Sequence, residues 1–294
     1  MFNIIKNYLR VLEVISSLNC ELEFKSGVGR NQKMSDLEVV AMSLTAEFMS
    51  IDGENSLFKQ ITSAEIPNLI ERSQFNKRRR KLFLFLEEVR LKLASRFLEF
   101  EDYFIVDSMP LEICKFARHR RIKIWKKEFE TAPSKEFCAS KNTWSYGYKL
   151  HGICSISAIF HSLDITKSED HNIRFLKNVK QQISDCVLLG DRGYLSKTIQ
   201  LDLFQTVNIK LEAPKKKNQK DYKPQPYIFR KSRKRIETLF SQLCDQFKIR
   251  NNYSKSFEGF KTRILAKITA LTLVQYVNKF IFDRLINNIK NQII

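Results

Sequence analysis

Three acidic residues occupy positions where the neighbouring sequence predicts burial. Asp107 follows the apolar run Tyr-Phe-Ile-Val, Asp191 follows Val-Leu-Leu-Gly, and Glu237 lies beside Ile236 at the edge of an apolar helix stripe. An ionised carboxylate in such a place must be paired or bound to a metal. Each of the three, taken alone, is explained equally well as a capped or salt-bridged structural acid. Taken together they form an all-oxygen ligand set for hard divalent cations, so we assign all three as metal ligands and catalytic residues.

Two Mg²⁺ or Mn²⁺ ions about 3.5–4 Å apart are the common arrangement for in-line displacement at a phosphodiester. Asp107 and Asp191 are expected to ligate both or either ion, and Glu237 the second. The elements that must position them follow an α/β order. Strands of apolar residues are expected to end at Asp107, just before Pro110, and at Asp191, and Glu237 is expected on a helix. We also expect strands at 144–157, 159–165 and 207–213, helices at 172–183 and 196–205, and a loop at 214–227.

The first 99 residues show helical spacing of apolar side chains. Ser35 and Glu38 form a capping box that predicts a helix from about residue 36 to 49. A second long helix is expected at 74–97, with the basic run 76–81 near its start, where cations oppose the helix dipole. This run is either a solvated charged face or a phosphate-contacting surface, and for the second case Arg78 and Arg79 are the candidate DNA contacts.

The order of these features resembles the ribonuclease-H-like core of bacterial insertion-sequence DDE transposases, most of all those without a large insertion domain. The resemblance rests on the strand ending at Asp107, a three-strand meander, the turn Gly-Asp-Arg-Gly-Tyr at 190–194, and Arg233 one helical turn before Glu237. It implies a mixed sheet flanked by helices and DNA as partner, both the inverted repeats that end the element and the target. It also implies cleavage at those ends, strand transfer into the target, and a homodimer on DNA.

The expected organisation has three parts. Residues 1–99 would form an all-α module that binds the DNA ends, 100–250 the catalytic domain, and 251–294 a C-terminal helical extension containing an amphipathic helix over about 257–285. Related families often have a tyrosine three residues before the arginine and a lysine seven after the glutamate. Here these positions hold Arg230 and Cys244, which leaves the three acids intact.

The charge favours nucleic acid as the partner. The formal net charge is +19, and residues 201–294 alone carry 20 basic against 7 acidic groups. Arg233 is the first candidate for a phosphate clamp. Further candidates for DNA binding are Arg192, Tyr194, Lys215, Lys216, Lys217, Arg120 and Arg121. For Tyr194 a core-packing role is an equal alternative, and for the basic and aromatic segment 118–127 a solvated loop is an equal alternative to a DNA channel.

Several protein classes are not expected from this sequence. The 6 cysteines form no Cys-x-x-Cys pair, so neither a disulfide framework nor a zinc site is predicted. No uninterrupted apolar run reaches the length of a membrane span, and we expect a cytoplasmic protein of a bacterial nucleoid without a membrane partner. With only 8 glycines and no Walker or Gly-x-Ser-x-Gly motif, ATP-driven and acyl-transfer chemistry are not expected.

Two other functions remain open. A nuclease, or an inactive relic that only binds DNA, would keep the same fold and acids. A non-catalytic basic protein that binds nucleic acid would use Asp107, Asp191 and Glu237 as ordinary structural acids.

Overall fold

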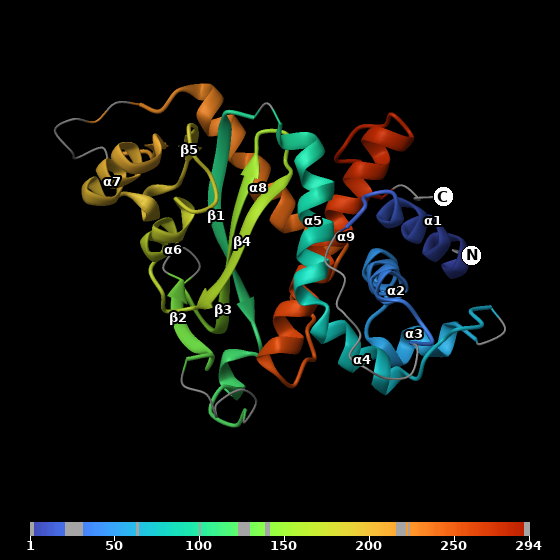
Figure 1. Ribbon diagram of the computed structural model, residues 1–294. Helices are drawn as coiled ribbons and strands as arrows, with labels where there is room; N and C mark the ends of the chain where they lie inside the picture. Colours follow the sequence, from blue (N-terminus) through green and yellow to red (C-terminus); the bar gives the residue numbers. More distant parts are fainter. Residues whose placement is uncertain are drawn as a thin grey trace. The chain divides into compact units, whose positions relative to one another are not determined.

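A computed structural model describes residues 3–20, 32–62, 65–99, 101–122, 130–138, 142–215, 222 and 224–290 (Figure 1). The chain divides into two compact units. One unit, here called the sheet unit, is Phe97–Gln242, and the other, the helical unit, combines Met1–Arg96 with Leu243–Ile294. The residues after Gln242 therefore share a unit with the N-terminal helices, whereas the sequence suggested a separate C-terminal extension from residue 251.

A six-stranded mixed sheet forms the centre of the sheet unit. Strand β3 pairs antiparallel with β1, β2 and β4, whereas β5 runs parallel to β1 and β6 parallel to β5. The strands are β1 (Tyr103–Glu112), β2 (Ser134–Cys138), β3 (Thr143–Ser155), β4 (Phe160–Lys167), β5 (Val187–Leu189) and β6 (Lys210–Glu212). This arrangement confirms the expected α/β fold with a mixed sheet flanked by helices, and the short strand β2 is an addition that the sequence did not predict.

Helices cover both faces of this sheet (Figure 1). On one face, Phe104 and Val106 of β1 pack in a single apolar cluster with residues of α6 (Asn172–Val179) and α7 (Lys197–Val207). On the other face, the rings of Phe160 in β4 and Phe240 in α8 (Tyr227–Asp245) lie 6.1 Å apart. Because successive residues of a strand point to opposite faces, Asp107 shares the α8 face with its cross-strand partner Gly152.

Strand β1 continues past Asp107, contrary to the expectation that Pro110 ends it. The backbone N–H of Ile113 donates to the carbonyl of Tyr146. Since hydrogen-bonded and non-hydrogen-bonded pairs alternate in an antiparallel ladder, the nitrogen of Pro110 points away from β3. On that side β5 accompanies β1 only as far as Ile105. The missing N–H of Pro110 therefore costs no ladder hydrogen bond.

The helical unit contains α1 (Ile4–Ser16), α2 (Asp36–Phe48), α3 (Glu54–Gln60), α4 (Arg72–Lys81), α5 (Phe83–Leu98) and α9 (Phe257–Tyr276). The predicted capping box is present, because the Ser35 hydroxyl accepts from the Glu38 N–H and the Glu38 carboxylate accepts from the Ser35 N–H. The helix expected at 74–97 is instead two helices that meet at Leu82. The basic run consequently lies in the last turn of α4, where cations complement the helix dipole.

Helix α9 is buried on nearly all sides rather than amphipathic, and it ends in a short π-helical segment at Val277–Ile281. Among the described residues, Phe257–Ile281 is the one helix with the length and hydropathy of a membrane span. In its most apolar window, 83% of the residues are buried inside the protein, as in the core helix of a globular unit. Helix α9 is thus the central helix of the helical unit.

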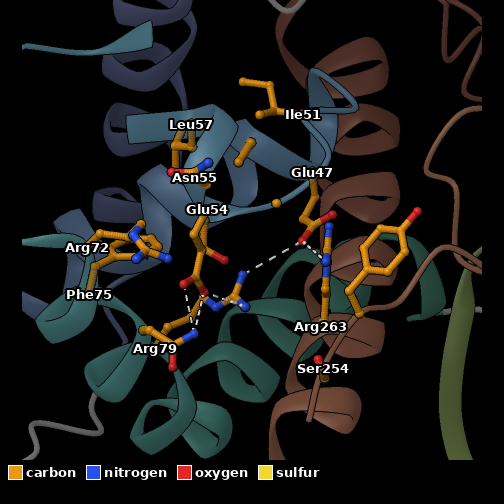
Figure 2. A pocket seen from close by; sticks show the side chains of 15 residues that line it. Glu47, Ile51, Glu54, Asn55, Leu57, Arg72, Phe75, Arg79, Ser254 and Arg263 are labelled. Atoms are coloured by element: carbon orange, nitrogen blue, oxygen red, sulfur yellow. Dashed lines mark hydrogen bonds and ion pairs between the residues drawn. The ribbon is translucent and has the colours of Figure 1, made fainter. Parts of the chain in front are cut away.

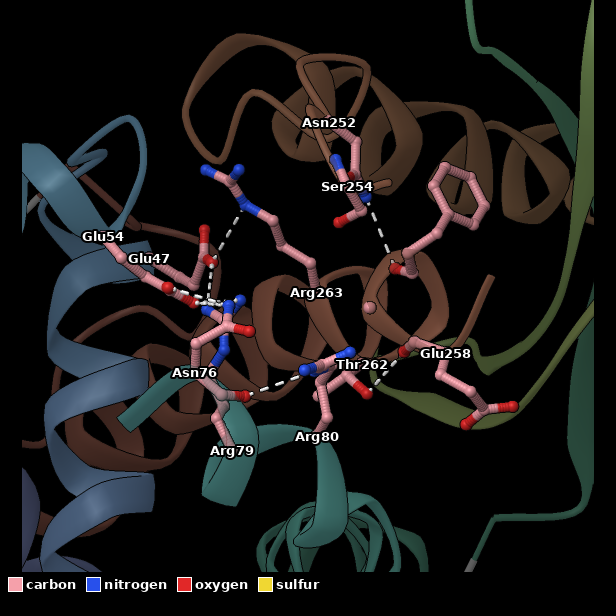
Figure 3. Close-up of polar contacts among 12 residues, drawn as sticks. Glu47, Glu54, Asn76, Arg79, Arg80, Asn252, Ser254, Glu258, Thr262 and Arg263 are labelled. Atoms are coloured by element: carbon pink, nitrogen blue, oxygen red, sulfur yellow. Dashed lines mark hydrogen bonds and ion pairs between the residues drawn. The ribbon is translucent and has the colours of Figure 1, made fainter. Parts of the chain in front are cut away.

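A buried ion-pair network ties α9 to α2 and α4 (Figures 2 and 3). The Glu47 carboxylate is 3% exposed and lies 2.6 Å from Lys267 Nζ, 3.5 Å from Arg263 Nε and 3.9 Å from an Arg79 guanidinium nitrogen. The Lys267 ammonium also donates to the carbonyl of Phe247. Burial lowers the pKa of Lys267, while Glu47 opposes that effect. One carboxylate thus compensates buried cations from two helices.

We expect Glu47→Gln to lower the free energy of unfolding by about 3–5 kcal/mol, because it leaves the buried ammonium of Lys267 without its ion-pair partner, whereas Arg79 keeps Glu54 and Arg263 keeps Asp52. The matched control is Glu13→Gln, which removes an ion pair with Arg10 from a carboxylate that is 69% exposed. That change should cost less than about 1 kcal/mol. Urea unfolding of both variants makes the comparison, and equal small losses would show that the buried network contributes little.

Candidate active site

Asp107 and Asp191 are carried by neighbouring parallel strands at matching positions. In the β1–β5 pair, Ile105 is in register with Leu189. Asp107 and Asp191 each lie two residues further on, so they point to the same face of the sheet as that pair. The parallel pairing therefore brings together two residues that are 84 positions apart in the sequence.

Backbone amides hold one oxygen of each aspartate. Asp107 Oδ1 accepts from the Ser108 N–H at 2.8 Å, and Asp191 Oδ1 accepts from the Gly193 N–H at 2.8 Å at the start of the short 3₁₀ turn Arg192–Tyr194. A Cβ at residue 193 would lie 3.0 Å from Asp191 Oδ1, so glycine allows this close approach. In the described part of the chain, nothing donates to either Oδ2. Each aspartate thus keeps one oxygen available.

The electrostatics of Asp107 bring Glu237 and Arg233 into the same site. Burial raises the pKa of Asp107 to about 6, the Ser108 N–H opposes this, and the remaining influences come from Asp191, Arg233 and Glu237. The two carboxylates raise the pKa further and the guanidinium lowers it. Arg233 and Glu237 lie one turn apart on α8, the helix that covers the Asp107 face. Asp191, Arg233 and Glu237 are therefore near enough to influence Asp107. Glu237 itself is exposed, contrary to the burial expected from the sequence.

The donor chemistry of this site suits a hard divalent cation. Its ligands would be carboxylate oxygens alone, and one oxygen of each aspartate is uncommitted. The pKa of Asp107 is raised first by burial and then by the neighbouring carboxylates, and a bound cation would favour its charged form. Within the described ranges, no three Asp, Glu, His or Cys side chains already lie close enough to surround a single ion. The three acids fit a divalent cation by their type and by their places in the fold. Their side chains would have to move to close around an ion.

A cleft of about 490 Å³ begins at Asp191 and is rich in cations. Three of the predicted DNA contacts line it: Arg192, Lys215 and Arg233. Arg230, one helical turn before Arg233, also lines the cleft and was not chosen from the sequence, although its place in the same basic run was a usable signal. The cleft is thus an anion-attracting surface that adjoins the carboxylates.

The other predicted contacts lie elsewhere. Tyr194 is fully buried in the cluster with Val106, which favours its packing role over base stacking. Arg120 and Arg121 are exposed after the short turn Phe116–Arg118, and Lys216 and Lys217 lie outside the described residues.

Arg78 and Arg79 already have carboxylate partners in the helical unit. Arg78 is paired with Asp36, and Arg79 is 2.9 Å from Glu54 and 10% exposed. These partners argue against a direct contact between either arginine and DNA. The sequence run alone did not distinguish inward from outward cations, because that depends on which side of α4 packs against α2 and α9.

Two supporting residues were missed. Ser108 Oγ donates to Asn172 Oδ1 at 3.3 Å, which links β1 beside Asp107 to the first turn of α6. Gly152 faces α8, and a Cβ there would lie 2.9 Å from the Phe160 ring. Glycine at this position lets the rings of Phe160 and Phe240 approach the sheet next to Asp107. A glycine in the middle of a strand was the available signal.

Replacing Asp107 with asparagine should stabilise the metal-free protein at neutral pH. The pKa of Asp107 in the folded state, about 6, lies above the unfolded value of 3.8, so the folded state binds the proton more tightly. Stability is therefore lost as pH rises from about 4 to 6. Asparagine removes that loss, so the gain should be small at pH 4 and about 2–3 kcal/mol at pH 8 in the presence of EDTA.

The control for this comparison is Asp202→Asn on α7, whose carboxylate is 41% exposed in a pair with Lys180. It should change stability by less than about 1 kcal/mol at both pH values. A pH-independent effect of Asp107→Asn in urea unfolding would contradict the electrostatic description of the site.

Comparison with known proteins gives one family match. The model of the transposase DDE domain matches residues 99–273, more than half of the chain and inclusive of all three acids. No curated protein matches. A solved structure, the Mos1 transposase paired-end complex with left transposon end, aligns with 90% of this chain and 85% of that chain at 13% identity. Its TM-score of 0.24 is too low to establish a shared fold. The family match places this chain in the DDE transposase family.

Proposed function

We propose that this transposase cleaves DNA at the ends of an insertion sequence and joins those ends to target DNA in a metal-dependent reaction. The observation that carries the proposal is that Asp107 and Asp191 follow adjacent parallel strands at matching positions, with Glu237 and Arg233 of α8 near enough to influence Asp107. Family membership supports the reaction class, and the acids supply a ligand set of the required chemistry.

Asp107 and Asp191 would hold the divalent ions through their free oxygens, and Glu237 would complete the second ion's ligands. The chemistry that bound Mg²⁺ or Mn²⁺ supplies is activation of the attacking oxygen and stabilisation of the leaving oxygen. The hydrogen bonds from Ser108 and Gly193 fix the orientation of the two aspartates before an ion arrives. The protein itself thus contributes a preoriented set of negatively charged oxygens.

The cations of the adjoining cleft would hold the DNA backbone. Arg233 is half-buried and close enough to Asp107 to lower its pKa, so it is placed to bind a phosphate next to the acids. Arg192 and Lys215 are exposed at the rim of the same cleft and would add affinity that is independent of sequence. By analogy with the family, the partners would be the terminal inverted repeats and target DNA, bound by a homodimer.

The alternatives differ in what the acids do. A nuclease would cut the ends without joining them, and an inactive relic or a non-catalytic binding protein would do neither. The raised pKa of Asp107 favours a functional site over a structural acid, because structural carboxylates are normally stabilised in their charged form by their partners.

The test compares wild type with Asp107→Asn, Asp191→Asn and Glu237→Gln on DNA that carries the element's own ends, with and without Mg²⁺. Each variant should reduce cleavage and strand transfer at least about a hundredfold, since each removes an oxygen charge that supports the transition state, and each should still bind DNA.

Glu112→Gln is the matched control, because Glu112 is an exposed carboxylate on the same strand as Asp107. It should leave both reactions unchanged. Cleavage that survives in all three acid variants would exclude the metal-site proposal, and cleavage without joining by the wild type would identify a nuclease.

A further inference from the structure

A second cationic groove lies in the helical unit, apart from the acids of the sheet unit. It has a volume of about 560 Å³ and runs between α4 and the segment that leads into α9. Its wall includes five cations and one carboxylate: Arg72, Lys77, Arg79, Arg80, Lys255 and Glu54. Figure 3 shows Arg79 and Arg80 projecting from α4 towards the start of α9, with Ser254 on the adjacent segment. We call this feature the α4–α9 groove.

The cations of α4 divide into two groups. Arg78 and Arg79 are held by carboxylates, as described above. In contrast, Arg72, Lys77 and Arg80 have no carboxylate within 4 Å in the parts of the chain that the structure describes, and the same holds for Lys255. The single acid of the wall, Glu54, is already neutralised by Arg79 and also accepts from Asn76 Nδ2 at 2.8 Å. The groove therefore carries an uncompensated positive charge.

The first turn of α9 opens onto the same groove. Ser256 caps this 20-residue helix by accepting from the Gly259 N–H at 3.2 Å, and both residues line the groove. The N–H groups of Phe257 and Glu258 precede any acceptor within the helix, so they add partial positive charge at this end. Glu258 is turned to a different partner, Lys261, at 2.9 Å.

An adjoining cavity of about 290 Å³ gives an independent sign that this region takes a polar ligand (Figure 2). It shares Arg72, Arg79 and Ser254 with the groove. Ser43 also lines it, is 1% exposed, and has a hydroxyl without any hydrogen-bond partner. A buried hydroxyl is rarely left unsatisfied, so an acceptor group or bridging water is expected in the cavity.

We infer that the α4–α9 groove binds the phosphate backbone of duplex DNA, which rests on the function proposed above. Guanidinium and ammonium groups, a helix N-terminus and serine hydroxyls are donors that suit phosphate oxygens. The groove would position DNA on the helical unit without selecting its sequence. Arg72, Lys77 and Arg80 would then be the DNA contacts of α4, in place of the carboxylate-paired Arg78 and Arg79.

The test is a triple variant, Arg72→Gln, Lys77→Gln and Arg80→Gln, measured for duplex DNA binding by fluorescence anisotropy in EDTA. EDTA removes any contribution from the metal-dependent reaction. Affinity should fall about tenfold or more near 0.1 M salt, and the slope of log K against log salt should fall by about 2–3. The loss should be the same for element ends and for unrelated duplexes, because phosphate contacts carry no sequence information.

The matched control is Lys6→Gln, Lys33→Gln and Lys59→Gln, which removes the same charge from exposed positions of the same unit outside the groove. It should leave the slope within about 0.5 of wild type. A slope equal to wild type in the groove variant, or equal losses in both triple variants, would overturn the inference. Because cleavage by the acids is measured separately, either result would leave the proposed reaction standing.

Folding is checked by thermal unfolding of both variants. If the groove variant unfolds, the single variant Lys255→Gln is measured instead. Lys255 is exposed in the segment before α9, so its substitution should leave the fold intact. For this variant, the slope of log K against log salt should fall by about 0.9. An unchanged slope for this variant, or a loss seen only with RNA duplexes, would also overturn the inference.

Discussion

Two like charges held at matching positions on parallel strands are the constraint on which the site depends. The pairing of β1 with β5 fixes Asp107 and Asp191 on one face, and α8 adds Glu237 to the same region. Burial, and to a smaller extent the charges of Asp191 and Glu237, raise the pKa of Asp107. The fold tolerates this because backbone amides hold one oxygen of each aspartate and Arg233 lies nearby, so the site is prepared for an added cation.

The helical unit, in contrast, buries several positive charges. Glu47 compensates Lys267, Arg263 and Arg79 where α2, α4 and α9 meet. Among the residues that the structure describes, Arg72, Lys77 and Arg80 have no carboxylate partner, and they lie beside the first turn of α9. The cations of the helical unit are therefore of two kinds. Some form ion pairs that stabilise the unit, and others remain available to bind a polyanion.

The sequence predicted the site better than its surroundings. Apolar runs ending in carboxylates and the stripe of α8 were sufficient to choose Asp107, Asp191 and Glu237 as candidates, but Glu237 is exposed rather than buried as expected. Tertiary packing decided the rest. Pro110 is tolerated because β5 leaves that edge of β1, and Arg79 is buried because it pairs with Glu47 and Glu54 where α4 packs on α2. Such features depend on residues that are distant in the sequence, so they cannot be predicted from one sequence alone.

Locating the metal directly would test the central claim most sharply. We would collect anomalous diffraction from crystals of the protein grown with Mn²⁺ and DNA ends. The account predicts manganese peaks with oxygen atoms of Asp107 and Asp191 about 2.0–2.3 Å away, and Glu237 at a second peak. Manganese bound elsewhere, with these carboxylates engaged only by protein groups, would contradict it.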